Sequence, residues 1–151
     1  MIELTIDNHN QQFVLEIKDL GLKEHSDFYW FVWDNGLVEE ENILLENQIQ
    51  NLMNWHERIL GLSSGEIYLP FDFSDQYLGC FRLSKVNSDF VMSYGIFDNV
   101  HAASPSYCRP LYRTKDMGNF IETLSPVKIN VKELLNDIER IVSDLFKELS
   151  S

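Results

Sequence analysis

The sequence has few cysteines, few basic residues and no long apolar run. Of its 151 residues, two are cysteines and twelve are lysines or arginines, against twenty-four aspartates and glutamates. Two cysteines cannot build the dense disulfide framework of small secreted domains, and the N-terminal residues lack the basic and apolar blocks of a secretory signal. No apolar run approaches the roughly 18 residues that a membrane span needs. We therefore expect a cytoplasmic protein in which Cys80 is a small core residue and is not bonded to Cys108.

The shortage of positive charge is concentrated in one half of the chain. Residues 1–75 carry fifteen acidic side chains and three basic ones, whereas residues 76–151 carry nine of each, and the formal net charge is −12. A negative field repels nucleic acids and anionic membranes and speeds association with cationic surfaces. The surplus therefore predicts a basic partner rather than nucleic acid or membrane. The alternative is that it only keeps the protein soluble.

Signatures of nucleotide, cofactor and metal sites are also missing from the sequence. It has no glycine loop of the phosphate-binding type, and none of its four histidines has a zinc-type partner at the right spacing: His9, His25, His56 and His101. We expect no metal and no cofactor. His56 falls on an apolar helical stripe, where we expect a partly buried imidazole with a hydrogen-bond partner.

Two patterns have the form of hydrolase motifs, and each has a simpler explanation. Residues 61–65, Gly-Leu-Ser-Ser-Gly, match the nucleophile elbow around Ser63, but a helix precedes the motif and a strand follows it, which reverses the required order. Asp72 and Asp75 resemble the paired carboxylates of glycosidases. Since they are three residues apart in a strand and turn, they more naturally cap a turn. We therefore expect no enzymatic activity.

Strands are predicted where apolar and polar residues alternate. This happens over 2–17, which favours a hairpin with a turn at its centre, and over 66–97, which favours an antiparallel meander. Gly79 and Gly95 lie inside the predicted meander strands. Glycine at such positions indicates a bulge or the close approach of another element.

Two helices are predicted from apolar residues at helical spacing. They cover about 41–60 and about 131–149, and Asn130 is a suitable N-cap for the second. The sequence therefore predicts one α+β domain over 1–151. It would contain an antiparallel sheet of about 6–7 strands, one inserted helix and one long C-terminal helix.

The stretch DFYWFVWDNG, residues 27–36, is the most aromatic part of the chain. Its aromatic and β-branched residues, followed by an Asn-Gly pair, predict a strand over 28–33. One alternate set of side chains would face the helices, and the other would face a second layer. The alternative is that this second set is an exposed anchor for a partner.

Residues 98–127 have no firm periodicity, which is unusual for so long a segment in a compact domain. Either it contains short elements, such as an edge strand over Tyr107–Tyr112, or it is functional. Its basic residues Arg109, Arg113 and Lys115 are too few for a phosphate track in a chain of this charge. They would instead hold an acidic ligand or pair with the protein's own carboxylates.

The order of hairpin, aromatic segment, helix and meander resembles a family of small immunity proteins. These proteins protect bacteria against their own wall-associated or contact-delivered toxins, and the WapI-type group is the most similar. The matching features, from Met1 to about Tyr94, are IELTID with FVLEI, the D-x-x-W pattern at 27–30 and the pattern L-x3-I-x2-L-M-x-W at 45–55.

The resemblance implies binding to a cognate toxin domain, commonly a nuclease, and occlusion of its active surface without catalysis. A nuclease is cationic where it meets its substrate, so an acidic face would complement it. We expect such a face to include the acids near the aromatic stretch and the first helix: Asp34, Glu39, Glu40, Glu41 and Glu46. The alternatives are a small hydrolase and a ligand-binding domain that uses the loop over 98–127.

Overall fold

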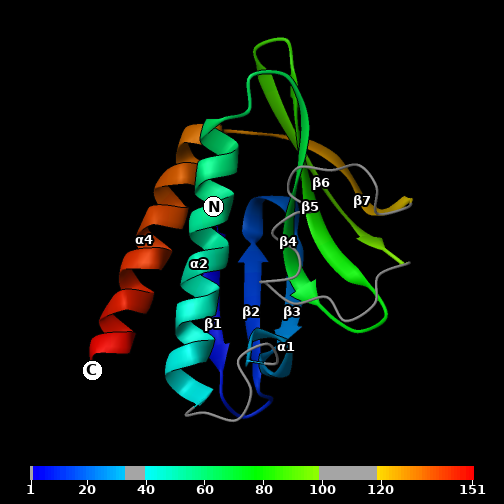
Figure 1. Ribbon diagram of the computed structural model, residues 1–151. Coiled ribbons are helices and arrows are strands. Elements are labelled where there is room, and N and C mark those ends of the chain that lie inside the picture. Colours follow the sequence, from blue (N-terminus) through cyan, green and yellow to red (C-terminus); the bar gives the residue numbers. More distant parts are fainter. Residues whose placement is uncertain (1, 33–39, 99–118) are drawn as a thin grey trace.

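The computed structural model describes residues 2–32, 40–98 and 119–151, without the side chains of Glu40 and Glu41. These residues form antiparallel strands and two long helices (Figure 1), which confirms the predicted α+β class. The strands are β1 (Ile2–Asp7), β2 (Gln12–Ile17), β3 (Leu22–Asp27), β4 (Gly65–Phe73), β5 (Leu78–Val86), β6 (Asp89–Phe97) and β7 (Phe120–Ile129). The helices are the 3-10 turn η1 (Lys18–Leu20), α1 (Phe28–Val32), α2 (Glu40–Leu60) and α4 (Val131–Ser150).

The strands are divided between two antiparallel sheets. Strands β1, β2 and β3 form the first sheet in that order, and β4, β5, β6 and β7 form the second. The two sheets approach each other where β3 lies beside β4. Because each sheet pairs strands that follow one another along the chain, simple turns connect most neighbours.

The helices α2 and α4 lie side by side in front of the first sheet (Figure 1). Each turns an apolar stripe inward, as predicted from its periodicity, and α4 begins where Asn130 Oδ1 accepts hydrogen bonds from the amides of Lys132 and Glu133 at 3.0 and 3.2 Å. Such a cap satisfies amides that have no partner within the helix. None of the helices in the described ranges is long and apolar enough to span a membrane.

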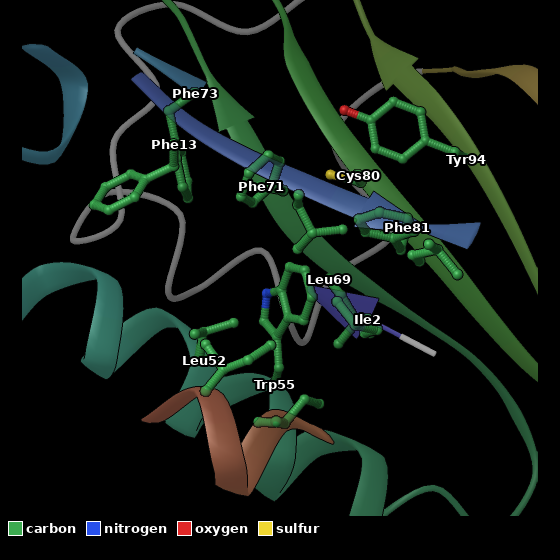
Figure 2. Packing of buried hydrophobic residues seen from close by; sticks show 14 of the residues in the cluster. Ile2, Phe13, Leu52, Trp55, Leu69, Phe71, Phe73, Cys80, Phe81 and Tyr94 are labelled. Atoms are coloured by element: carbon green, nitrogen blue, oxygen red, sulfur yellow. The ribbon is translucent and has the colours of Figure 1, made fainter. Parts of the chain in front are cut away.

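Trp55 of α2 is the largest fully buried side chain in the core (Figure 2). Its ring contacts those of Phe71 and Phe81 edge to face, at centroid distances of 6.5 and 5.6 Å. Its indole N–H donates to the carbonyl oxygen of Pro70 at 2.9 Å. The bond satisfies the one polar group of the side chain and ties α2 to β4.

The prediction of a strand over 28–33 is wrong, because residues 28–32 form the short helix α1. A helical turn places Phe28 and Phe31 on one side, where both pack edge to face against Phe13 at 5.1 and 4.9 Å. In a strand these two residues would point to opposite faces. Tertiary packing thus overrides the strand preference of aromatic residues. Phe28 and Phe31 are buried, whereas Tyr29 is exposed.

Two strands were not predicted from the sequence. In β3, the core-facing positions after Leu22 are Glu24 and Ser26, so the strand lacks apolar alternation. In β7, nearly every residue is exposed and Pro126 interrupts the pattern. The predicted loop over 98–127 therefore ends in a strand. The predicted edge strand over 107–112 lies outside the described residues.

The close approach predicted at the strand glycines is confirmed. A Cβ atom at Gly79 would lie 2.2 Å from the hydroxyl oxygen of Tyr94, and one at Gly95 would lie 2.3 Å from the carbonyl oxygen of Ile121. Real Cβ atoms do not come so close to other heavy atoms. Only glycine fits at either position without a shift of its neighbours.

Candidate functional site

The outer face of the first sheet carries a cluster of acidic side chains. The strand register places Glu3, Glu16 and Lys23 in one cross-strand row and Asp7, Gln12 and Asp27 in another, so the four carboxylates share this face with one lysine. The other face of the same strands contributes Ile2, Phe13, Leu15 and Ile17 to the core. We call the set Glu3, Asp7, Glu16 and Asp27 the acidic sheet face.

Hydrogen bonds in the turn after β1 stabilise the ionised form of one of these carboxylates, that of Asp7. Asp7 Oδ1 accepts a hydrogen bond from the amide of Asn10 at 3.1 Å, and Oδ2 accepts one from the Asn10 side chain at 2.8 Å. Hydrogen bonds to the ionised form stabilise it, so the Asn10 side chain and amide lower the pKa of Asp7 below its ordinary value. The acidic sheet face therefore keeps this charge at neutral pH.

An open hollow of ≈ 640 Å³ lies at the end of the acidic sheet face. Asn8, Asn10, Gln11 and Asp27 supply polar groups to its wall. The apolar part of the wall comes from Phe28, Tyr29, Val32 and Leu44. An aromatic surface with amides and one carboxylate is suited to receive a side chain that has a long apolar stem and a cationic end.

Tyr29 is the exposed aromatic residue at this hollow. It is 58% exposed, and its ring stacks edge to face on Trp30 at 4.8 Å. Edge-to-face contact is a favourable geometry for two aromatic rings and favours one position of the Tyr29 ring. Rigid aromatic side chains of this kind are common anchors in protein interfaces. An exposed anchor is one of the two alternatives predicted for the aromatic stretch, and the sequence pattern does not single out Tyr29.

The acidic residues predicted to bind a partner are only partly within the described structure. Glu46 is exposed on α2, on the helix layer rather than on the acidic sheet face. Asp34 and Glu39 lie outside the described residues, and the side chains of Glu40 and Glu41 are not described either. The acids of the first half therefore occupy at least two surfaces, of which the acidic sheet face carries four carboxylates.

A second group of acidic and phenolic side chains lies between the two sheets. Asp72 accepts a hydrogen bond from the Tyr77 hydroxyl at 2.9 Å. Burial raises the pKa of Asp72 to about 7, the Tyr77 bond opposes this rise, and the nearby charges of Glu24 and Asp27 add to it. Burial likewise raises the pKa of Glu24. Little in the sequence indicates this cluster, because Glu24 occupies a core-facing position that alternation would assign to an apolar residue.

The hydrolase alternatives do not gain support from this geometry. Asp72 is hydrogen-bonded to Tyr77, whereas Asp75 is exposed, so the two predicted carboxylates do not converge. Ser63 is exposed in the turn between α2 and β4, as expected for a connecting loop. His101 lies outside the described residues.

The other residues singled out from the sequence are one histidine, one cysteine and the basic residues of the segment 98–127. His56 is half-buried and its Nε2 lies 2.8 Å from Glu139 Oε1, which confirms the expected hydrogen-bond partner. Cys80 is buried in the core, as expected. Arg109, Arg113 and Lys115 fall outside the described residues. Within residues 2–32, 40–98 and 119–151, no group of three or more His, Cys, Asp or Glu side chains is placed to hold a metal ion.

Comparison with known proteins finds similarity at the level of the fold. No family model matches the sequence, and no curated protein matches it. A solved structure that is similar is a chain of the CdiA-CT/CdiI toxin and immunity complex from Enterobacter cloacae. The two share 14% sequence identity at a TM-score of 0.50, over 94% of each chain. Because the match spans nearly all of both chains, the shared feature is the whole fold rather than one motif.

Proposed function

We propose that this chain is an immunity protein, which binds a cognate bacterial toxin domain and neutralises it by occlusion, without catalysis. The observation that carries the proposal is the fold shared with a chain of a toxin and immunity complex over 94% of both chains. The resemblance of the sequence to WapI-type immunity proteins supports the same function from independent features, and we include the WapI type in the proposal.

The charge of the chain indicates the kind of toxin. A nuclease domain is basic where it meets nucleic acid, and the acidic sheet face offers carboxylates from three adjacent strands to such a surface. Long-range attraction of this kind raises the association rate, and it weakens as salt is added. We therefore propose a cationic nuclease as the toxin. Glu46 and its predicted neighbours Asp34, Glu39, Glu40 and Glu41 would extend the acidic surface.

The exposed ring of Tyr29 and the hollow beside it would supply the short-range part of binding. Buried aromatic anchors contribute most to the lifetime of a complex, whereas surrounding charges act mainly on its formation. Tyr29→Ala is expected to raise the dissociation rate of the complex by about tenfold or more. The stability of the free protein should change little, because the Tyr29 side chain is mostly exposed.

A growth assay tests the proposed function in cells. A candidate toxin domain, sought among the genes next to this one, would be expressed from an inducible promoter, with and without the chain. Cells that contain both proteins are expected to grow, and cells that contain the toxin domain alone are expected to stop. If the chain is produced as folded protein and the toxin domain still arrests growth, the proposed function is wrong.

A matched pair of variants tests the role of the acidic sheet face. Glu16→Gln with Asp27→Asn removes two charges from this face, and Asp89→Asn with Asp98→Asn removes two exposed charges elsewhere. We expect the first variant to associate with the toxin about tenfold more slowly at low salt and the second to behave as wild type. If both variants associate with the toxin equally slowly, the association rate depends on the net charge of the protein and not on the acidic sheet face.

A further inference from the structure

Within residues 2–32, 40–98 and 119–151, the two sheets have four edge strands, and three of them are covered or interrupted. Strands β3 and β4 lie beside each other, so each shields the other's edge. Strand β7 contains Pro126, and its register against β6 is irregular at two points. Proline and bulges are features that prevent an edge from pairing with another chain. The fourth edge strand, β1, has a regular register and no proline.

Contacts with α4 show which backbone groups of β1 face outward. The amide of Ile2 donates to Asp137 Oδ2 at 2.9 Å, and its carbonyl accepts from Arg140 Nη2 at 2.8 Å. An amide has one proton, so Ile2 does not also donate to β2. In an antiparallel pair the residues alternate between facing the neighbouring strand and facing away. The amides and carbonyls of Leu4 and Ile6 therefore face away from β2 as well.

A groove of ≈ 390 Å³ runs along this same edge. Its wall includes Leu4 and Ile6 on β1, together with apolar residues of the two long helices: Leu44, Leu45, Ile141 and Leu145. Arg140, Asp144 and Glu148 lie on its α4 side, where the Arg140 guanidinium is 3.9 Å from the Asp144 carboxylate. The groove thus places outward backbone hydrogen-bonding groups next to an apolar wall that carries two acidic residues and one basic residue.

We propose that β1 pairs with an extended segment of the toxin, which adds a fourth strand to the first sheet over Leu4 to Ile6. Side chains of a strand alternate between its two faces. Two aliphatic side chains of the segment would enter the groove beside Leu4 and Ile6. The residues between and beside them would lie over the acidic sheet face. This inference rests on the proposed function and names the contact through which it would operate.

The charges around β1 define the sequence that the segment needs. Glu3 and Asp7 lie on the outer face at either end of the open stretch. Directly opposed unlike charges stabilise a strand pair, and like charges destabilise it. The five residues of the segment that lie opposite Glu3 to Asp7 should therefore be basic, aliphatic, any residue, aliphatic and basic, in that order. A second copy of this chain fits poorly, because antiparallel pairing of two β1 strands about Thr5 would set Glu3 of one against Asp7 of the other.

Amide hydrogen exchange of the intact protein, measured by NMR, tests this proposal. The probe is the blocked peptide Ser-Lys-Val-Thr-Val-Lys-Ser. One control peptide carries glutamate in place of both lysines, and the other carries N-methyl groups on both valines, which removes the donors that would pair with β1. We expect the first peptide to slow exchange at Leu4 and Ile6 by about tenfold or more. Neither control peptide should do so.

A charge variant adds a second readout. Glu3 is exposed, and its pairing with Lys18 at 3.3 Å lies on the surface, so Glu3→Lys should fold. The variant is expected to lose its preference for the lysine peptide over the glutamate peptide. An unchanged preference, or equal slowing by the N-methylated peptide, overturns the proposal. So does slowed exchange at Leu4 and Ile6 that grows with protein concentration alone, since it would identify a second copy as the occupant.

The same measurement with the toxin domain separates this inference from the proposed function. If the toxin domain binds and exchange at Leu4 and Ile6 stays fast, the strand pairing is wrong and the proposed function stands. If the toxin domain does not bind while the lysine peptide slows exchange at both amides, the proposed function is wrong, and β1 still takes a basic strand. Slowing by both ligands supports both proposals.

Discussion

Replacing Asp72 by asparagine is expected to stabilise the protein at pH 8 and to leave it nearly unchanged at pH 4. Burial between the sheets raises the pKa of Asp72 from 3.8 to about 7. Between these values the folded protein holds a proton that the unfolded chain has released. Stability therefore falls as the pH rises through this window, because the folded state binds more protons than the unfolded state. Asparagine carries no charge at any pH and can still accept the bond from Tyr77.

The size of the effect follows from the two pKa values. A rise from 3.8 to about 7 corresponds to about 4 kcal/mol, at about 1.4 kcal/mol per tenfold change in proton affinity. Asp72 is not completely buried, and solvent screens part of the cost of its charge. We therefore expect Asp72→Asn to raise the free energy of unfolding by roughly 2–4 kcal/mol at pH 8.

Urea unfolding of both proteins at pH 4 and pH 8 measures this difference. The matched control is Asp75→Asn, an identical substitution three residues away at an exposed side chain. It should change stability by less than about 0.5 kcal/mol at either pH. If Asp72→Asn destabilises the protein at pH 8, or if its effect is the same at both pH values, the reasoning from burial is refuted.

Substitutions at three further positions, each measured by urea unfolding, test the packing of the core and the capping of α4. Gly79→Ala should destabilise the protein by about 1–3 kcal/mol, because the new methyl group would collide with the Tyr94 hydroxyl; wild-type stability would contradict the packing described. Tyr94→Phe should be neutral or stabilising, by up to about 1 kcal/mol, since it removes a buried hydroxyl that has no hydrogen-bond partner among the described residues. If Tyr94→Phe instead lowers the free energy of unfolding by more than about 1 kcal/mol, the hydroxyl has a hydrogen-bond partner in the folded protein. Asn130→Ala should cost about 1 kcal/mol through loss of the α4 N-cap, and Asn130→Ser should restore most of it.

Periodicity predicted the helices and the regular strands because each has one buried face. The helix expected over 41–60 begins at Glu40 and ends at Leu60, and the helix expected over 131–149 begins at Val131 and ends at Ser150. The segments that were missed do not alternate apolar and polar residues in this way. Strand β3 places Glu24 toward the core, and β7 is exposed along nearly its whole length.

The aromatic helix was missed for a different reason. Strand propensity describes how well a side chain fits a half-buried pleated surface, whereas residues 28–32 follow directly from β3 and must turn into the core. The amide of Phe28 bonds to the carbonyl of Gln11 at 2.9 Å, and one helical turn then brings Phe31 beneath Phe13. Neighbours distant in the sequence determine this path, since Phe31 also packs against Phe73 of β4 at 5.2 Å and its carbonyl accepts a hydrogen bond from Asn47 of α2.

The acidic sheet face was predictable in part. The alternation of acids with isoleucines and leucines in residues 2–7 predicts a solvent-exposed strand face that carries Glu3 and Asp7. The pairing of Asp27 with the same row requires β3, which the sequence did not indicate. The open edge of β1 was beyond sequence reasoning, because it depends on which strand lies outermost and on where α4 meets Ile2.

Titration of the purified toxin domain with this chain tests the central claim most directly. The toxin domain identified by the growth assay would be assayed for its activity, a nuclease activity in our proposal, while increasing amounts of the chain are added. We predict that activity falls in proportion to the added chain and vanishes at a one-to-one ratio, as expected for occlusion by a tightly bound inhibitor. Undiminished activity in the presence of excess folded chain would contradict the account.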